Sequence, residues 1–137
     1  MKKILLLAFT LLLLLGVALV WPHYHPDLPL ETLKEKYTYP DSRFPRVQDM
    51  PVHYRSTGEG TPLVLLHGTG ASLHTWEGWT QRLDTAFRVI SLDLPAFGLT
   101  GPHPERDYSI ESYVRFLDAF ADSLHLPLGF EFAPEGV

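Results

Sequence analysis

The chain has 137 residues, a formal net charge of −5 and no cysteine. That length fits one small domain. Its 11 lysines and arginines are scattered rather than clustered, which argues against a nucleic-acid partner. The absence of cysteine excludes disulfides, thiolate zinc sites and a thiol nucleophile, and we expect no metal and no cofactor.

The N-terminus is the clearest physical signal in the sequence. The stretch from Ile4 to Trp21 has no charged residue, and as a helix it would be about 27 Å long, close to the thickness of a bilayer core. Lys2 and Lys3 precede it and would stay on the cytoplasmic side. We predict a membrane signal-anchor at residues 1–21, with the rest of the chain on the extracytoplasmic (periplasmic) side. Secretion after signal cleavage and a soluble buried helix are the alternatives.

Residues 22–45 are rich in proline, tyrosine and charge, and five prolines exclude long regular elements. This segment is typical of a spacer, with room for a short helix from Leu30 to Tyr37. Next, the stretch from Val47 to Ser56 alternates enough to predict a hairpin arm that turns near Gln48 and Asp49.

The region after the hairpin has the pattern of an α/β domain. Two continuous apolar runs, Leu63 to Leu66 and Arg88 to Asp93, predict strands that are covered on both faces. A helix between them would place four side chains on one face toward the sheet: Leu73, Trp76, Trp79 and Leu83. A strand, a helix and a strand in about thirty residues form a crossover unit, so we expect the two strands to be parallel.

A second helix should begin after a loop that is rich in proline and glycine. Ser109 can cap it, and its predicted apolar face consists of Ile110, Tyr113, Val114, Leu117, Ala121 and Leu124. The residues from His125 to Val137 do not predict a buried strand. We expect His74, His103 and His125 to lie on the surface or in loops.

Two stretches of the sequence resemble a known family. LVLLHGTGAS, then Trp76, then RVISLDLPAFGLTG resemble, in order and spacing, the amino-terminal half of an α/β-hydrolase domain, the fold of many esterases, lipases and epoxide hydrolases. The resemblance covers about residues 46–126 and leaves residues 127–137 as a tail outside the family pattern. It implies an α/β fold with a partial hydrolase sheet: a hairpin arm plus parallel strands with flanking helices, behind the N-terminal anchor helix.

The resemblance also implies roles for the two motifs. His67, Gly68, Thr69 and Gly70 would form an oxyanion loop, in which the amide of Thr69 donates to a developing oxyanion and His67 orients the loop. Fixed backbone donors of this kind lower an acyl-transfer barrier by about 3 to 4 kcal/mol each. The alternative is a plain turn from strand to helix.

In the second motif, Asp93, Pro95 and Gly98 would be structural, with Asp93 organising the turn from Pro95 to Gly98. Ala96 stands where the family usually has glycine. If that position needs a positive φ, alanine costs about 1 kcal/mol.

The family's nucleophile is not recognisable in these 137 residues. A nucleophile elbow needs glycine two residues before and two residues after the serine. Only Ser72 has glycine at the first position, and His74 occupies the second. We expect Ser72 to cap a helix, and we assign no catalytic nucleophile, acid or base.

Three functional hypotheses follow. The parent of this chain hydrolysed a small apolar ester or a related substrate by Ser-His-Asp chemistry, and this chain is a truncated, inactive fragment of it. Alternatively, the chain is a non-catalytic, membrane-anchored binding or interaction protein that uses the retained pocket wall. In a third reading it is a fragment without a folded function. The expected partners are the membrane, through Ile4 to Trp21, and a small-molecule substrate for the full-length parent only.

Overall fold

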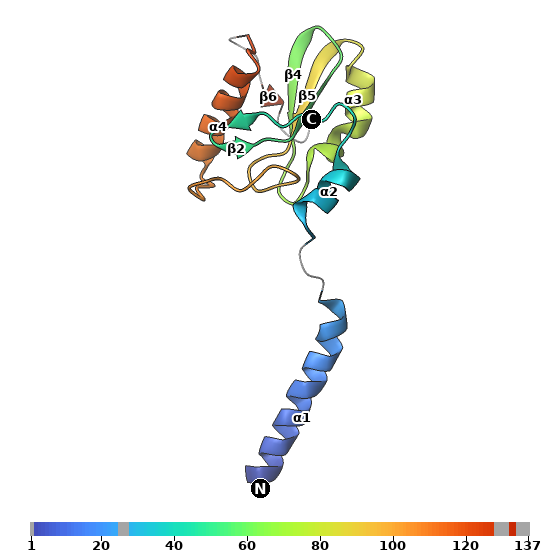
Figure 1. Ribbon diagram of the computed structural model, residues 1–137, viewed down its shortest axis with the longest axis vertical. Helices are drawn as coiled ribbons and strands as arrows, with labels where there is room; N and C mark the ends of the chain where they lie inside the picture. Colours follow the sequence, from blue (N-terminus) through green and yellow to red (C-terminus); the bar gives the residue numbers. More distant parts are fainter. Residues whose placement is uncertain (1, 25–27, 128–131, 134–137) are drawn as a thin grey trace.

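The computed structural model describes residues 2–24, 28–127 and 132–133. It begins with one uninterrupted apolar helix, α1 (Lys2–Val20), followed by a 3-10 turn, η1 (Trp21–His23) (Figure 1). The side chains of α1 are exposed throughout. By length and composition this is the one segment of the described chain that is able to cross a membrane, and a signal sequence has the same features.

A four-stranded sheet forms the centre of the remaining chain. Its order is β3 (Tyr54–Thr57), β5 (Phe87–Leu92), β4 (Thr61–Leu66) and β6 (Phe132–Ala133). β3 runs antiparallel to β5, whereas β4 runs parallel to both β5 and β6. The two predicted parallel strands are therefore confirmed.

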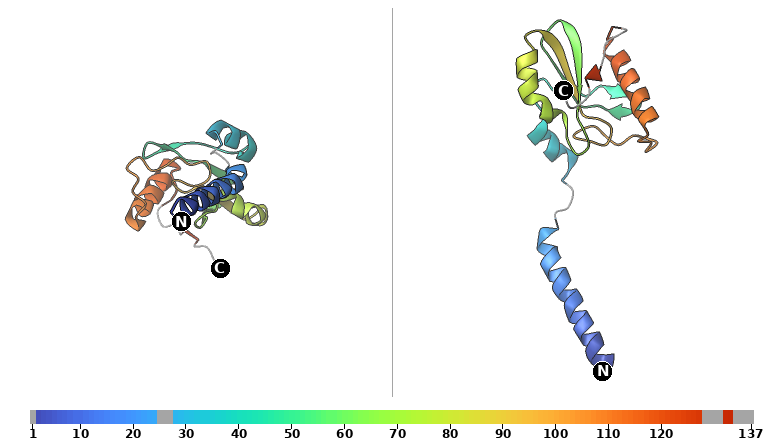
Figure 2. Two further views of the ribbon diagram at one scale, coloured as in Figure 1. Left: turned by 90° about the horizontal axis from the view of Figure 1, so that it is seen from below. Right: turned by 180° about the vertical axis from the view of Figure 1, so that it is seen from behind.

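Helices cover both faces of this sheet, because the two crossover connections run in opposite directions along it. From β4 the chain crosses to β5 on one side, and from β5 it crosses back past β4 to β6 on the other side. The connection from β4 to β5 contains η2 (Leu73–Trp76) and α3 (Glu77–Leu83), and the connection from β5 to β6 contains α4 (Ile110–Ser123). Right-handed crossovers in opposite directions place their helices on opposite faces. Figures 1 and 2 show α3 and α4 on opposite sides of the sheet.

The predicted hairpin arm is present as a separate two-stranded ribbon of β1 (Arg46–Val47) and β2 (Met50–Pro51). Gln48 and Asp49 form its turn, both with positive φ, as a tight two-residue hairpin requires. The arm is shorter than predicted, because Tyr54–Thr57 joins the main sheet instead. The ribbon packs against α4 over a buried core of Val47, Met50, Val52, Tyr54, Val64, Ile90, Leu92, Phe116 and Phe120.

The predicted faces of both helices are wrong in part. Trp79 is 51% exposed, whereas Thr80 is buried. The helical stretch begins with a 3-10 turn, whose three residues per turn rotate the later positions away from the α-helical period counted from Leu73.

In α4, the predicted core residues Ile110 and Val114 are exposed, and the chain buries Ser112, Phe116 and Phe120 instead. Two phenylalanines remove more apolar area from water than the aliphatic stripe beside them, and Phe120 packs edge-on against Tyr54. The predicted cap is confirmed, since the backbone N–H of Ser112 donates to the Ser109 hydroxyl.

After His125 the sequence predicts no buried strand. In the described part of this segment, Phe132–Ala133 forms a two-residue strand, β6, at the outer end of the sheet, which pairs with Val64 and Leu65 of β4. Phe132 and Ala133 are flanked by glycines and prolines, so the local sequence gives only a weak signal for a strand. The pairing therefore depends on the edge that β4 presents to them.

The segment before the sheet packs onto the domain. Helix α2 (Leu30–Tyr37) lies where the sequence predicts it. After it, Arg43 forms an isolated bridge with Tyr54, and the Arg55 guanidinium pairs with Asp41. The residues from α2 onward therefore take part in the tertiary structure.

Candidate functional site

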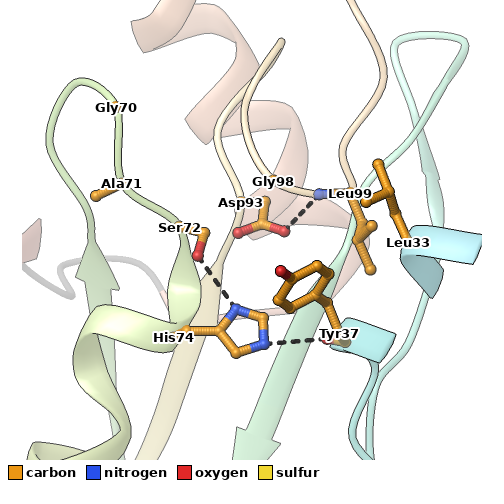
Figure 3. Close-up of a pocket in the computed structure, with 9 residues that line it drawn as sticks. All are labelled: Leu33, Tyr37, Gly70, Ala71, Ser72, His74, Asp93, Gly98 and Leu99. Carbon is orange, nitrogen blue, oxygen red and sulfur yellow. Dashed lines mark hydrogen bonds between the residues drawn. The ribbon is translucent and has the colours of Figure 1, made fainter. Parts of the chain in front are cut away.

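The candidate site lies in the crevice where the two crossovers diverge. The loop after β4 goes to one face of the sheet and the loop after β5 goes to the other, and such a switch point is where open α/β sheets bind ligands. A cavity of about 260 Å³ lies there. Figure 3 shows residues of both loops and of α2 around it: Leu33, Tyr37, Gly70, Ala71, Ser72, His74, Asp93, Gly98 and Leu99.

His67 joins the two loops. It is buried, and its Nδ1 lies 2.8 Å from the carbonyl oxygen of Gly68, which accepts only. Nδ1 therefore carries the proton, and Nε2 accepts from the backbone N–H of Leu94 at 3.1 Å. Because both ring nitrogens are engaged, His67 is placed to hold the loop and has no free nitrogen for proton transfer.

The loop that follows His67 contains two backbone N–H groups that bond to none of the described residues. The amides of Thr69 and Gly70 make no hydrogen bond to any described residue, whereas the amide of Ala71 donates to the Gly68 carbonyl. Gly70 has a φ of +75°, and it lines the cavity, although Thr69 does not. An exposed amide beside a cavity is a donor for a ligand oxygen.

Asp93 lies at the end of β5 and is fully buried. One carboxylate oxygen accepts from the Leu73 amide at 2.8 Å, and the other accepts from the Leu99 amide and from Nδ1 of His53, both at 2.8 Å. Burial alone would raise the pKa of Asp93, but these hydrogen bonds and the charge of His53 outweigh it and hold the pKa below its usual value.

The turn after Asp93 contains two residues with positive φ. Ala96 has a φ of +67°, so the alanine that replaces the family's glycine is indeed in a strained conformation. Gly98 has a φ of +52°, and a Cβ built on it would overlap the carboxylate of Asp93. Pro95 is buried, and its carbonyl accepts from the Tyr113 hydroxyl.

His53 is fully buried and is a site residue that was not predicted from the sequence. Its Nε2 lies 2.8 Å from the hydroxyl oxygen of Ser42, so Ser42, His53 and Asp93 form a hydrogen-bonded chain. The available signal was a histidine between two apolar residues in a short strand pattern, Val52-His53-Tyr54. A histidine at such a position needs a buried partner.

Ser72 occupies the position before η2, but the predicted side-chain cap is wrong. Its hydroxyl makes no capping hydrogen bond and instead lies 3.1 Å from Nδ1 of His74. The expected surface or loop position is also wrong for His74, which lies in η2, is half-buried and is bonded through both ring nitrogens.

The expected surface or loop position is confirmed for His103, which lies in the loop between β5 and α4, although its side chain is buried beside Ser112 because α4 turns this serine inward. It is also confirmed for His125, which is exposed after α4.

Known proteins similar to this chain agree on one family. Residues 61–130 match a family model described as alpha/beta hydrolase fold. A haloalkane dehalogenase from Mesorhizobium japonicum is 32% identical over 103 residues, which cover 74% of this chain and 31% of the relative. A pimeloyl-(acyl-carrier protein) methyl ester esterase from Nitrosomonas europaea is 33% identical over 73 residues, 53% of this chain and 27% of the relative.

Solved structures give the same result. The crystal structure of the Cif epoxide hydrolase from Acinetobacter nosocomialis matches with a TM-score of 0.60 and 27% identity, over 74% of this chain and 36% of that chain. The chain spans about a quarter to a third of the length of the curated relatives that it matches.

We expect Gly98→Ala to destabilise the domain much more than Gly70→Ala. Both glycines have positive φ, which costs alanine about 1 kcal/mol. A Cβ at Gly70 meets open space, whereas one at Gly98 displaces the Asp93 carboxylate and adds about 3 kcal/mol or more. Urea unfolding of the full chain in a mild detergent measures the difference. Equal losses of stability in the two variants would show that the carboxylate does not constrain the turn.

We expect Asp93→Asn to lower the free energy of unfolding at neutral pH by about 3 to 5 kcal/mol, because it removes one partner of a buried pair. Since the folded pKa of Asp93 is depressed, its contribution is present above the unfolded value of about 3.9 and is lost as pH falls through the folded value. The difference between the wild type and this variant should therefore shrink below about pH 4. Denaturant titrations across pH measure it, with Asp118→Asn on the exposed face of α4 as control. A difference that stays constant in acid would contradict the assignment.

Proposed function

The chain belongs to the α/β-hydrolase fold family, and from this premise we propose that it provides the oxyanion-loop half of a site for a small, neutral, apolar ester or related acyl compound. The supporting observation is a pair of amides, at Thr69 and Gly70, that make no hydrogen bond to a described residue and lie beside a cavity at the switch point of the sheet. In this arrangement the carbonyl oxygen of the ligand would accept from the loop.

We further propose that these 137 residues do not run the Ser-His-Asp reaction of the parental enzyme. No serine in the sequence has glycine at both elbow positions, and the curated relatives are about three to four times longer than the matched part. The nucleophile elbow, the histidine base and the acid of the parent would belong to a part of the hydrolase domain outside the part that these residues match.

The walls of the cavity favour neutral ligands. Leu33, Ala71 and Leu99 supply apolar surface, and the Asp93 carboxylate at the wall would repel an anion. The oxygens of Asp93 already accept three hydrogen bonds, so they offer little to a ligand cation.

A non-catalytic binding protein is the second candidate function. This function is favoured because α2 lines the cavity. Leu33 and Tyr37, which come from the segment before the domain, close one side of the cavity. In that case the chain would hold an apolar ligand without converting it.

We place this site at a membrane. Helix α1 is apolar and unburied, and Lys2 and Lys3 at its start favour a cytoplasmic N-terminus, with the domain on the extracytoplasmic side. Secretion after cleavage of the helix as a signal sequence is the alternative.

Ligand binding tests the proposed function. We expect 2-pentanone, a stable neutral carbonyl compound, to shift the amide NMR signals of Thr69 and Gly70 in the full chain in detergent micelles, whereas butanoate at the same concentration does not. The Gly58 amide, in a distant turn, serves as the internal control. Equal shifts with both compounds, or no shift with either, would contradict the proposal.

Anchoring has a separate test. We expect the full chain to remain in membranes during alkaline carbonate extraction and to keep its N-terminal residues by mass spectrometry. Leu12→Arg should weaken this retention, because a charged side chain at the helix centre costs about 2.5 to 3.5 kcal/mol. The matched control is Leu30→Arg in α2. A mature protein that begins after Trp21 would support the cleaved signal sequence instead.

A further inference from the structure

We propose that Ser72 and His74 form a nucleophile and base pair that accepts an acyl group from a small, activated, neutral ester. This inference rests on the cavity of the proposed function but not on the nucleophile elbow of the family. Both side chains line that cavity, and Ser72 Oγ lies 3.1 Å from Nδ1 of His74 (Figure 3).

The hydrogen bonds of His74 decide which nitrogen is the base. Its Nε2 lies 3.0 Å from the backbone carbonyl oxygen of Tyr37, which accepts only, so Nε2 carries the proton. In the neutral ring Nδ1 is then the free acceptor, and the Ser72 hydroxyl donates to it. A serine on a base whose other nitrogen is held by an acceptor is the arrangement of an activated nucleophile.

Aromatic packing fixes the imidazole in this orientation. The ring of Tyr39 stacks on His74 with centroids 5.0 Å apart, and the ring of Tyr37 packs edge-on at 5.9 Å. The Arg55 guanidinium lies 3.7 Å from the centroid of the Tyr39 ring and is itself paired with Asp41 and Glu77. The base is therefore held by contacts that exist before any ligand binds.

Among the described residues, two other serines are bonded to a histidine. Ser112 lies 3.5 Å from His103 and outside this cavity. Ser42 is bonded to His53, and its chain to His53 and Asp93 has the connectivity of a triad. Two observations favour Ser72. His53 is fully buried, and neither it nor Ser42 lines the described cavity. The Ser42 oxygen also accepts a hydrogen bond from the Tyr39 amide, which occupies one of its two lone pairs and makes it a weaker nucleophile.

The proposed step is a simple acyl transfer. Ser72 Oγ attacks the carbonyl carbon of the ester and its proton moves to Nδ1 of His74, while the carbonyl oxygen takes up negative charge near the amide of Gly70. The tetrahedral intermediate then collapses, the bond to the alcohol oxygen breaks, and Nδ1 returns the proton to the leaving alcohol. The products are acyl-Ser72 and one alcohol.

The test is acylation of the full chain in detergent by p-nitrophenyl butanoate. We expect a burst of up to one equivalent of nitrophenol, a mass increase of one butanoyl group, and a modified peptide that carries the group on Ser72. Ser72→Ala should abolish the adduct, and His74→Gln should slow its formation by about 10²-fold or more. Ser123→Ala, on the outer part of α4, should leave it unchanged.

The other outcomes are decisive. An adduct on Ser42, or one on His74 that persists in Ser72→Ala, would overturn the proposal. Binding of 2-pentanone to Ser72→Ala, followed at the Gly70 amide, shows whether this variant keeps a folded site. If the wild type binds 2-pentanone but is not acylated, this inference alone fails. If it does not bind the ketone, the proposed function fails.

Discussion

The buried carboxylate of Asp93 holds together three parts of the chain that are distant in sequence. It accepts from Leu73 at the start of η2, from Leu99 in the loop after β5, and from His53 before β3. A buried carboxylate is costly unless hydrogen bonds compensate it, and here three donors do so. The positions of both cavity loops depend on this group, since each loop supplies one of its donors.

The directions of the two crossovers make this arrangement possible. Because the chain leaves β4 and β5 toward opposite faces, a crevice opens between their ends, and the carboxylate lies at its base. The segment before the sheet then closes one side. α2 contributes Leu33 and Tyr37, and the Arg55 and Tyr39 stack fixes His74 beside them. A region whose composition resembles a spacer therefore shapes the site.

Local sequence patterns predicted the parts of the fold that local forces govern. The apolar runs of β4 and β5, the tight turn at Gln48 and Asp49, and the Ser109 cap are short-range features and are present as expected. The helix faces were predicted less well. Periodicity offered several apolar stripes in α4, and only packing against Tyr54 selected the one with Phe116 and Phe120. Strand β6 is beyond local prediction because its pairing needs the edge of β4.

For the site, the sequence by itself determined the motif residues His67 to Gly70 and Asp93 to Gly98, because glycines and a strand-end aspartate leave few backbone solutions. It also determined membership of the hydrolase family and the absence of an elbow serine within these residues. The tertiary structure decided which histidines are hydrogen-bonded within and next to the site. His53 and His74 acquire their roles from Asp93, Ser42, Ser72 and Tyr37, whose bonds to them come mostly from distant parts of the chain. The hydrogen-bond partner of a buried polar group depends on which distant residues the folded chain brings next to it. No local sequence pattern encodes the distance in space between two such residues.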